Sequence, residues 1–130
     1  MKNFYKAIIL LLVSMSLFCL FGCSGESKEV TLRIVSTFSE DMYVNEDGTV
    51  GHTTSDEYTV TVKKGDAIID GIATLKSISD DKITVKLDKY FISYDAEKPG
   101  GKHTIKKGEN LSFLMDGLMD ATESYTIYFE

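Results

Sequence analysis

The sequence predicts an all-β fold, an antiparallel β-sandwich of the immunoglobulin-like kind, from Glu29 to Glu130. Segments in which apolar and polar residues alternate recur along this part of the chain, and alternation is the signature of half-buried strands. Turn sequences containing Gly, Asp or Ser separate the segments about every 8–15 residues, a spacing typical of sandwiches and barrels. Apolar residues at helical spacing do not extend over about three turns anywhere after residue 28.

The predicted strands each place one apolar face toward a core. The first, Glu29–Phe38, directs Val30, Leu32, Ile34 and Phe38 to one side and polar residues to the other. Three further segments show the same alternation: Tyr58, Val60 and Val62; Ile83, Val85 and Leu87; and Tyr125, Ile127 and Phe129. We expect these side chains to fill the space between two sheets.

Two segments allow more than one interpretation. Lys89–Tyr94 is rich in aromatic and aliphatic residues, which predicts either a strand buried on both sides or a bend from one sheet to the other. The apolar residues from Leu111 to Met119 have the spacing of a short helix, although Gly117 and the strand-like flanks weaken this interpretation.

Turn chemistry predicts the connections between the strands. Asp47-Gly48 suits a tight hairpin because Gly tolerates the positive φ of such turns. Ser79–Lys82 is predicted to join Ile72–Ile78 to Ile83–Leu87 as a second hairpin. The segment Met119–Tyr125 resembles the tyrosine corner of immunoglobulin-like sandwiches, with a spacing from Asp120 to Tyr125 that is one residue longer.

The N-terminus has the composition of a targeting segment. Lys2 and Lys6 precede the apolar segment Ala7–Phe21, and the sequence Leu20-Phe21-Gly22-Cys23 follows. This arrangement resembles the signal peptide and lipobox of bacterial lipoproteins, with Phe21 in place of the usual small or β-branched residue. The resemblance implies cleavage before Cys23, attachment of fatty acyl chains such as palmitate to this residue, and a lipid-anchored location on the extracytoplasmic face of the cell membrane.

The implied organisation is a signal peptide over residues 1–22, a lipidated tether over 23–28 and a single sandwich domain over 29–130. An uncleaved membrane anchor is one alternative, since Ala7–Cys23 is close to the shortest length that crosses a bilayer. Simple secretion is another. In all of these cases the domain lies outside the cytoplasmic membrane, in the cell envelope.

Composition limits the classes of partner. Residues 23–130 retain 12 of the 14 Lys and Arg residues and all 20 Asp and Glu residues, so their net charge is −8. This balance argues against nucleic acid, because neutralising phosphates requires a clustered basic face. No cysteine follows Cys23, so the domain is predicted to be stable without disulfides or thiolate metal ligands.

Charge is divided unevenly along the chain. Between Arg33 and Lys63 there is no Lys or Arg, but there are six acids: Glu40, Asp41, Glu46, Asp47, Asp56 and Glu57. Ten lysines lie from Lys63 to Lys107, and only acids follow. Acidic segments that lie near each other would form a patch of one sign opposite a sheet studded with lysines.

The candidate binding residues are Asp41, Tyr43, Glu46 and Asp47, in a segment, Ser39–Asp56, that the sequence predicts to be loop. The carboxylates are candidate ligands for Ca²⁺ or attractors of a cationic partner, and Tyr43 could contact a sugar or a protein. Asn45–Gly48 resembles part of a calcium loop, but Tyr43 and Thr54 occupy the positions of its first acid and closing Glu, so it is not an EF-hand.

No catalytic residue or cofactor is predicted beyond the candidate Ca²⁺ site. The two histidines, His52 and His103, have no metal-binding spacing, and the chain contains no phosphate loop, serine elbow or cysteine nucleophile in the domain. The predicted function is therefore a non-catalytic interaction or ligand-capture module for a protein or glycan. An accessory calcium-binding domain and a small hydrolase with paired carboxylates are the alternatives.

Overall fold

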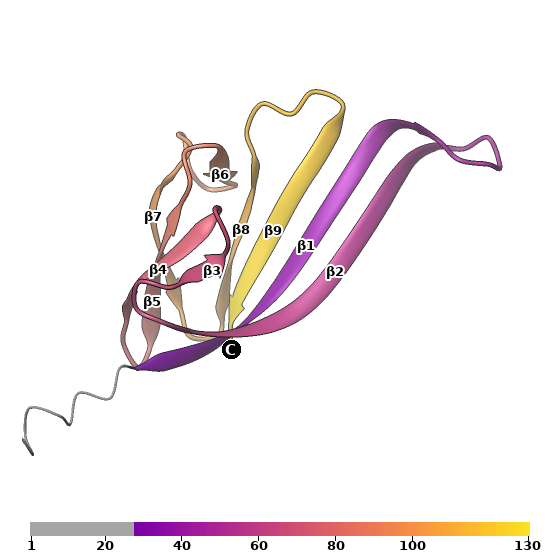
Figure 1. Ribbon diagram of the computed structural model, residues 1–130. Helices are drawn as coiled ribbons and strands as arrows, with labels where there is room; N and C mark the ends of the chain where they lie inside the picture. Colours follow the sequence, from indigo (N-terminus) through magenta and orange to yellow (C-terminus); the bar gives the residue numbers. More distant parts are fainter. Residues whose placement is uncertain (1–27) are drawn as a thin grey trace, which may run out of the picture.

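The computed structural model describes residues 28–130, which form two antiparallel sheets packed face to face in a β-sandwich (Figure 1). Sheet A has the strand order β2 (Val50–Lys63), β1 (Glu29–Val44), β9 (Ala121–Phe129), β8 (Glu109–Met115) and β6 (Phe91–Ser93). Sheet B has the order β3 (Ala67–Ile69), β4 (Ala73–Ile78), β5 (Lys82–Leu87) and β7 (Gly101–Lys106). The signal peptide, the lipobox and Cys23 lie outside the described residues.

The all-β sandwich is confirmed, but the immunoglobulin-like arrangement is not. An immunoglobulin domain pairs its strands in the orders ABED and CFG, which differ from the strand orders seen here. The tyrosine corner is also absent at Tyr125, whose hydroxyl donates to the Glu123 carboxylate (2.5 Å) and not to upstream backbone. Among residues 28–130, no helix is long and apolar enough to span a bilayer.

The core lies between the sheets and contains most of the predicted inward-facing residues together with others that were not predicted, such as Leu75, Ile105 and Phe113. Its fully buried large side chains come from both layers: Leu32, Ile34, Leu75, Ile83, Leu87, Ile105, Phe113 and Ile127. Of the triplet on β2, only Val62 is buried, while Tyr58 is 36% exposed. Phe38 on β1 is also exposed, at 39%. Sheet B is shorter than β1 and β2, so these side chains have no facing sheet against which to pack.

The two ambiguous segments are resolved by the packing. The chain leaves sheet B at the end of β5 and enters sheet A at β6, so Lys89–Tyr94 makes the bend between sheets. The expectation of a short helix over Leu111–Met119 is wrong. Leu111 and Phe113 point inward at strand spacing within β8, and the residues after Met115 form the β8–β9 loop.

The predicted hairpins are present. Gly48 has φ +82° in the turn between β1 and β2, and the Ser79 N–H donates to the Lys82 carbonyl (2.8 Å) between β4 and β5. The expectation that Ser39–Asp56 is loop is wrong. The register between β1 and β2 continues without a break from Glu29↔Lys63 to Glu40↔His52, and a bulge then precedes the pair Val44↔Val50.

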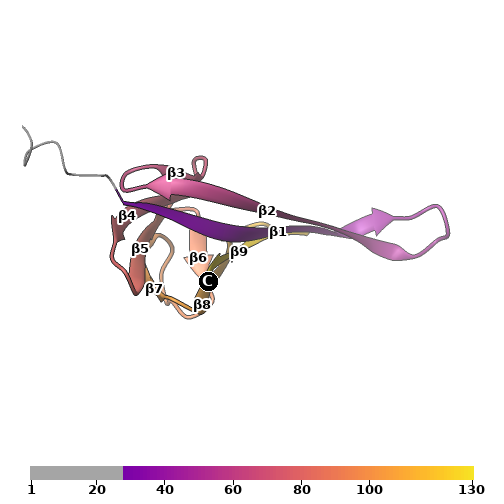
Figure 2. The ribbon, with the colours of Figure 1, turned by 90° about the horizontal axis from the view of Figure 1, so that it is seen from below.

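The outer part of this hairpin, residues 38–54, is called the arm. Figure 2 shows the arm projecting well beyond the two packed layers. Polar cross-strand pairs join its strands, such as the hydroxyls of Ser39 and Thr53 at 3.0 Å and of Thr37 and Ser55, at its base, at 3.4 Å. These pairs stabilise a ribbon whose two faces are not covered by sheet B.

Candidate functional site

The arm begins where sheet A loses its other strands. The pairing of β1 with β9 ends at Glu40↔Ala121, so beyond Glu40 the described residues give β1 only β2 as a neighbour. The β8–β9 loop lies beside the base of the arm, because the Asp41 N–H donates to the Asp120 carbonyl (3.0 Å). The arm and this loop therefore lie side by side at the end of the molecule opposite the start of β1 (Figure 1).

Hydrogen bonds fix the tip of the arm. The Asn45 side-chain amide donates to the carbonyls of Thr49 (3.2 Å) and Gly51 (2.8 Å), while one oxygen of Asp47 accepts from the N–H and hydroxyl of Thr49 (3.0 and 2.6 Å). The two Thr49 hydrogen bonds lower the pKa of the Asp47 carboxyl, the hydroxyl bond contributing most. The tip is thus a hydrogen-bonded turn.

Large apolar side chains are exposed on this surface. Met42 is 72% exposed, Val44 64%, Val50 68% and Met119, on the β8–β9 loop, 93%. Contiguous exposed apolar side chains of this kind are typical of a binding surface, since monomeric proteins rarely leave them open to water.

A hollow of about 400 Å³ lies between the arm and the β8–β9 loop, lined by Met42, Tyr43, Leu118 and Met119, with Glu40 and Asp120 beside them. The Tyr43 ring packs against the His52 ring of the facing strand, with centroids 5.1 Å apart. The hollow thus combines apolar side chains with carboxylates. We use the name tip patch for the exposed apolar and aromatic residues of this surface: Met42, Tyr43, Val44, Val50, Leu118 and Met119.

Carboxylates lie on both elements that form the tip patch. Glu40, Asp41 and Glu46 come from the arm, and Asp116 and Asp120 come from the β8–β9 loop. The four ion pairs found among residues 28–130 use none of these acids. The surface therefore presents negative charge to an incoming partner.

The predicted residues Asp41, Tyr43, Glu46 and Asp47 all lie on the arm, but their carboxylates do not converge. Within residues 28–130, no group of three or more His, Cys, Asp or Glu side chains is arranged to hold a metal ion. Asp47 is engaged in the turn. Its role in this structure is to shape the tip, and Tyr43, at 48% exposure, is the predicted residue that contributes most directly to the tip patch.

A second hollow, of about 210 Å³, lies on the inner face of the arm's base, where sheet B no longer covers sheet A. Phe38, Thr54, Asp56, Glu123 and Tyr125 line it. Burial raises the pKa of the Tyr125 hydroxyl, and its hydrogen bond to Glu123 raises it further. Sequence reasoning missed this hollow because it assigned the segment from Ser39 onward to loop.

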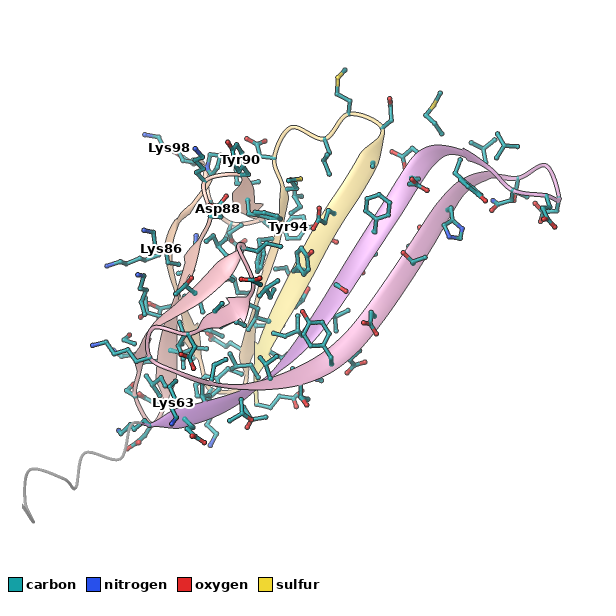
Figure 3. The ribbon with its side chains drawn as sticks, viewed as in Figure 1. Lys63, Lys86, Asp88, Tyr90, Tyr94 and Lys98 are labelled. Carbon is teal, nitrogen blue, oxygen red and sulfur yellow. The ribbon has the colours of Figure 1, made fainter. Side chains whose placement is uncertain are left out.

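Charge is also segregated between the two sheets. The strands of sheet B contain five lysines and no Asp or Glu, whereas sheet A and its loops carry the acidic arm. In Figure 3 the labelled Lys63, Lys86 and Lys98 lie on the side of sheet B, away from the arm. This arrangement agrees with the acidic patch opposite a lysine-studded sheet that the charge pattern predicts.

Comparison of the chain with known proteins finds no match to any protein family, curated protein or solved structure.

Proposed function

We propose that this protein is a lipid-anchored interaction module of the cell envelope, non-catalytic, which binds a protein partner through the tip patch. The observation that carries the proposal is the exposure of Met42, Val44, Val50 and Met119 on two elements, the arm and the β8–β9 loop, that contain acids but no Lys or Arg. The complementary partner has an apolar centre and a basic rim. Burying the apolar side chains supplies affinity, while the carboxylates increase the association rate and select the partner.

This chemistry favours a protein over the other ligands that the sequence suggests. A glycan would meet one exposed aromatic ring, Tyr43, and few polar groups among the aliphatic and thioether side chains of Met42, Leu118 and Met119. A calcium ion would require carboxylates that converge, and Asp41, Glu46 and Asp47 are spread along the arm. Methionine adapts its shape to irregular partners, which suits a protein-binding surface.

The proposed lipid anchor rests on the resemblance of the N-terminus to lipoprotein signal peptides. The course of β1 supports an orientation in which the tip patch points away from the membrane. The described chain enters the fold at Lys28, and β1 runs for 16 residues to the arm. At about 3.3 Å per residue, this strand spans roughly 50 Å. A lipid on Cys23 would therefore hold one end of the domain at the membrane and present the tip patch far from it.

The lipid anchor is tested by replacing Cys23 with Ala. Because the thiol of Cys23 would carry the lipid, we expect a clickable fatty acid fed to the cells to label the parent protein and not the Cys23→Ala variant. Equal labelling of the two proteins would contradict the anchor and leave the proposal for the tip patch standing.

The tip patch is tested by site-specific photo-crosslinking in intact cells. A photoreactive amino acid at Val50 should give one discrete adduct, and the same amino acid at Thr84, on the outer face of sheet B, should not give that adduct. The Met42→Ser, Met119→Ser variant should reduce the yield by roughly tenfold, since it removes apolar contact area. An adduct unaffected by this variant would contradict the proposal.

The charge contribution is tested with Asp41→Asn, Glu46→Gln and Asp120→Asn, which spare Asp47 because it shapes the turn. With the crosslinked partner purified, we expect slower association and a flatter salt dependence, while the dissociation rate changes little. An unchanged association rate would show that the acids do not steer the partner.

A further inference from the structure

The outer face of sheet B carries a regular array of lysines. The register between β5 and β7 places Lys82 opposite Lys106, Thr84 opposite Thr104 and Lys86 opposite Lys102. The alternate residues Ile83, Val85 and Ile105 are buried, so these lysines and threonines all point away from the core. Lys76 on β4 lies beside Lys86 across a hollow of about 270 Å³. We call Lys76, Lys82, Lys86, Lys102 and Lys106 the lysine face.

The array is unusual because like charges stand directly opposite each other. Cross-strand neighbours in an antiparallel pair have Cβ atoms about 4.5–5.5 Å apart, and like charges in this position destabilise a sheet. An acid opposite a lysine would be favourable in this position. Here the strands of sheet B contain no Asp or Glu, and no residue of the lysine face takes part in an ion pair among residues 28–130.

We infer that the lysine face binds a linear polyanion that carries phosphate groups. Each opposed pair, Lys82 with Lys106 and Lys86 with Lys102, offers two ammonium groups to one phosphate. The pairs are four residues apart along β5, or about 13 Å, so a chain laid along the strand meets both. The hydroxyls of Thr84 and Thr104 lie between them as further donors. Bound phosphate removes the repulsion that the free sheet carries.

The side chains of the lysine face favour a simple polyphosphate-type chain over nucleic acid. The outward positions of β5 and β7 are Lys and Thr only, so there is no aromatic ring or Arg on which a base could stack. The net negative charge of the sequence argues against nucleic acid, because neutralising its phosphates requires basic residues that are clustered. The fold does cluster them, because residues about 20 positions apart in the chain become neighbours across the sheet.

This inference is independent of the tip patch, which lies on the arm. The experiment titrates the full chain, in neutral detergent at about physiological salt, with inorganic polyphosphate and follows binding by calorimetry and by the melting temperature. Lys86→Gln, Lys102→Gln removes one opposed pair. Lys64→Gln, Lys98→Gln is the matched control, because it removes the same charge from exposed turn and loop positions.

We expect the first double variant to bind polyphosphate roughly tenfold more weakly or worse, and the slope of log affinity against log salt to fall by about one for each lysine lost. The control should bind as the parent protein does. In the absence of polyphosphate, the first variant should melt at a higher temperature than the parent, since it relieves the repulsion, whereas the control should not.

Three results would overturn the inference. Equal losses in the two double variants would mean that only net charge matters. An absence of saturable binding by the parent protein would mean that there is no site. Tighter binding of single-stranded DNA or of polyglutamate than of polyphosphate, at equal charge concentration, would mean that the ligand class is wrong.

Discussion

Phe113 is the largest fully buried side chain of the core. Its ring stacks on Tyr125 with centroids 5.7 Å apart, and its edge meets Phe91 at 6.1 Å. Phe113→Ala should lower the free energy of unfolding by about 3–5 kcal/mol, because it removes this contact and leaves a cavity. Urea denaturation measures the change. Met119→Ala, at a position 93% exposed, should cost less than about 0.5 kcal/mol, and equal costs would contradict the packing.

Tyr125 is expected to make the free energy of unfolding fall as the pH rises into the alkaline range. Burial, and then the hydrogen bond to Glu123, raise the pKa of its hydroxyl above the ordinary value of about 10. A raised pKa in the folded state means that this contribution is fully present below about pH 10 and is lost as pH rises further, since the unfolded chain gives up the proton first. Urea denaturation between about pH 8 and 11 should show this loss in the parent protein and a smaller one in Tyr125→Phe. Identical pH profiles would contradict the assignment.

At the scale of elements, β2 is a long edge strand that the described residues leave unpaired on one side. The Glu57 N–H donates to the Asp56 carboxylate (3.0 Å) and the Lys63 N–H donates to Asp66 (2.9 Å), so both N–H groups point away from β1. Alternate residues of a strand direct their N–H groups to the same side, so Ser55, Thr59 and Thr61 do likewise. The charged carboxylates of Asp56 and Glu57 disfavour pairing of this edge with a strand of another molecule.

Removing that protection should cause association. Asp56→Val, Glu57→Val takes two like charges from the edge and adds side chains that favour strands, so we expect dimers or larger species through β2. Sedimentation velocity measures the effect. Asp95→Val, Glu97→Val is the matched control in the loop between β6 and β7, and it should have the same association state as the parent protein. If both variants associate equally, general loss of charge is responsible and not the edge.

The sequence predicted strands where one face is buried, and it failed where neither face is. Ile83, Val85 and Leu87 alternate with polar residues because sheet A covers one side of β5 only. Along the arm, polar residues stand on both faces near its base and Met42, Tyr43 and Val44 follow one another directly, so the period of two disappears although the strands continue. The candidate residues Asp41 and Tyr43 lie on the arm, and Tyr43 lines the hollow. The tip patch was not predictable, because it also needs Met119 from a loop distant in sequence.

The same limit applies to the lysine face. Lys86 and Lys102 become partners only through the register of β5 with β7, and register is set by tertiary packing of the buried faces. The sequence indicated a lysine-rich segment from Lys63 to Lys107, without indicating which lysines share a face. The bend at Lys89–Tyr94, which sends the chain from one sheet to the other, was one of two alternatives for the same reason.

At the scale of the whole molecule, one buried cluster connects both sheets. We therefore expect the fragment 24–130 to fold alone, with a β-rich circular dichroism spectrum that reductant leaves unchanged, because no cysteine follows Cys23. Spectra with and without a reducing agent check both statements. A helical or random-coil spectrum would contradict the independence of the domain.

The continuity of β1 has a mechanical consequence. This strand runs unbroken from the end where the described chain enters the fold to the arm that carries the tip patch. A force applied between these two points therefore acts along the backbone of β1. The other strands of the sandwich lie to the side of this strand and are not part of the direct connection. A strand rises about 3.3 Å per residue, which is close to the maximum of about 3.3–3.6 Å per residue for a fully extended chain. The connection is thus almost taut before any load acts, and it transmits tension with little elongation and without first unravelling the core.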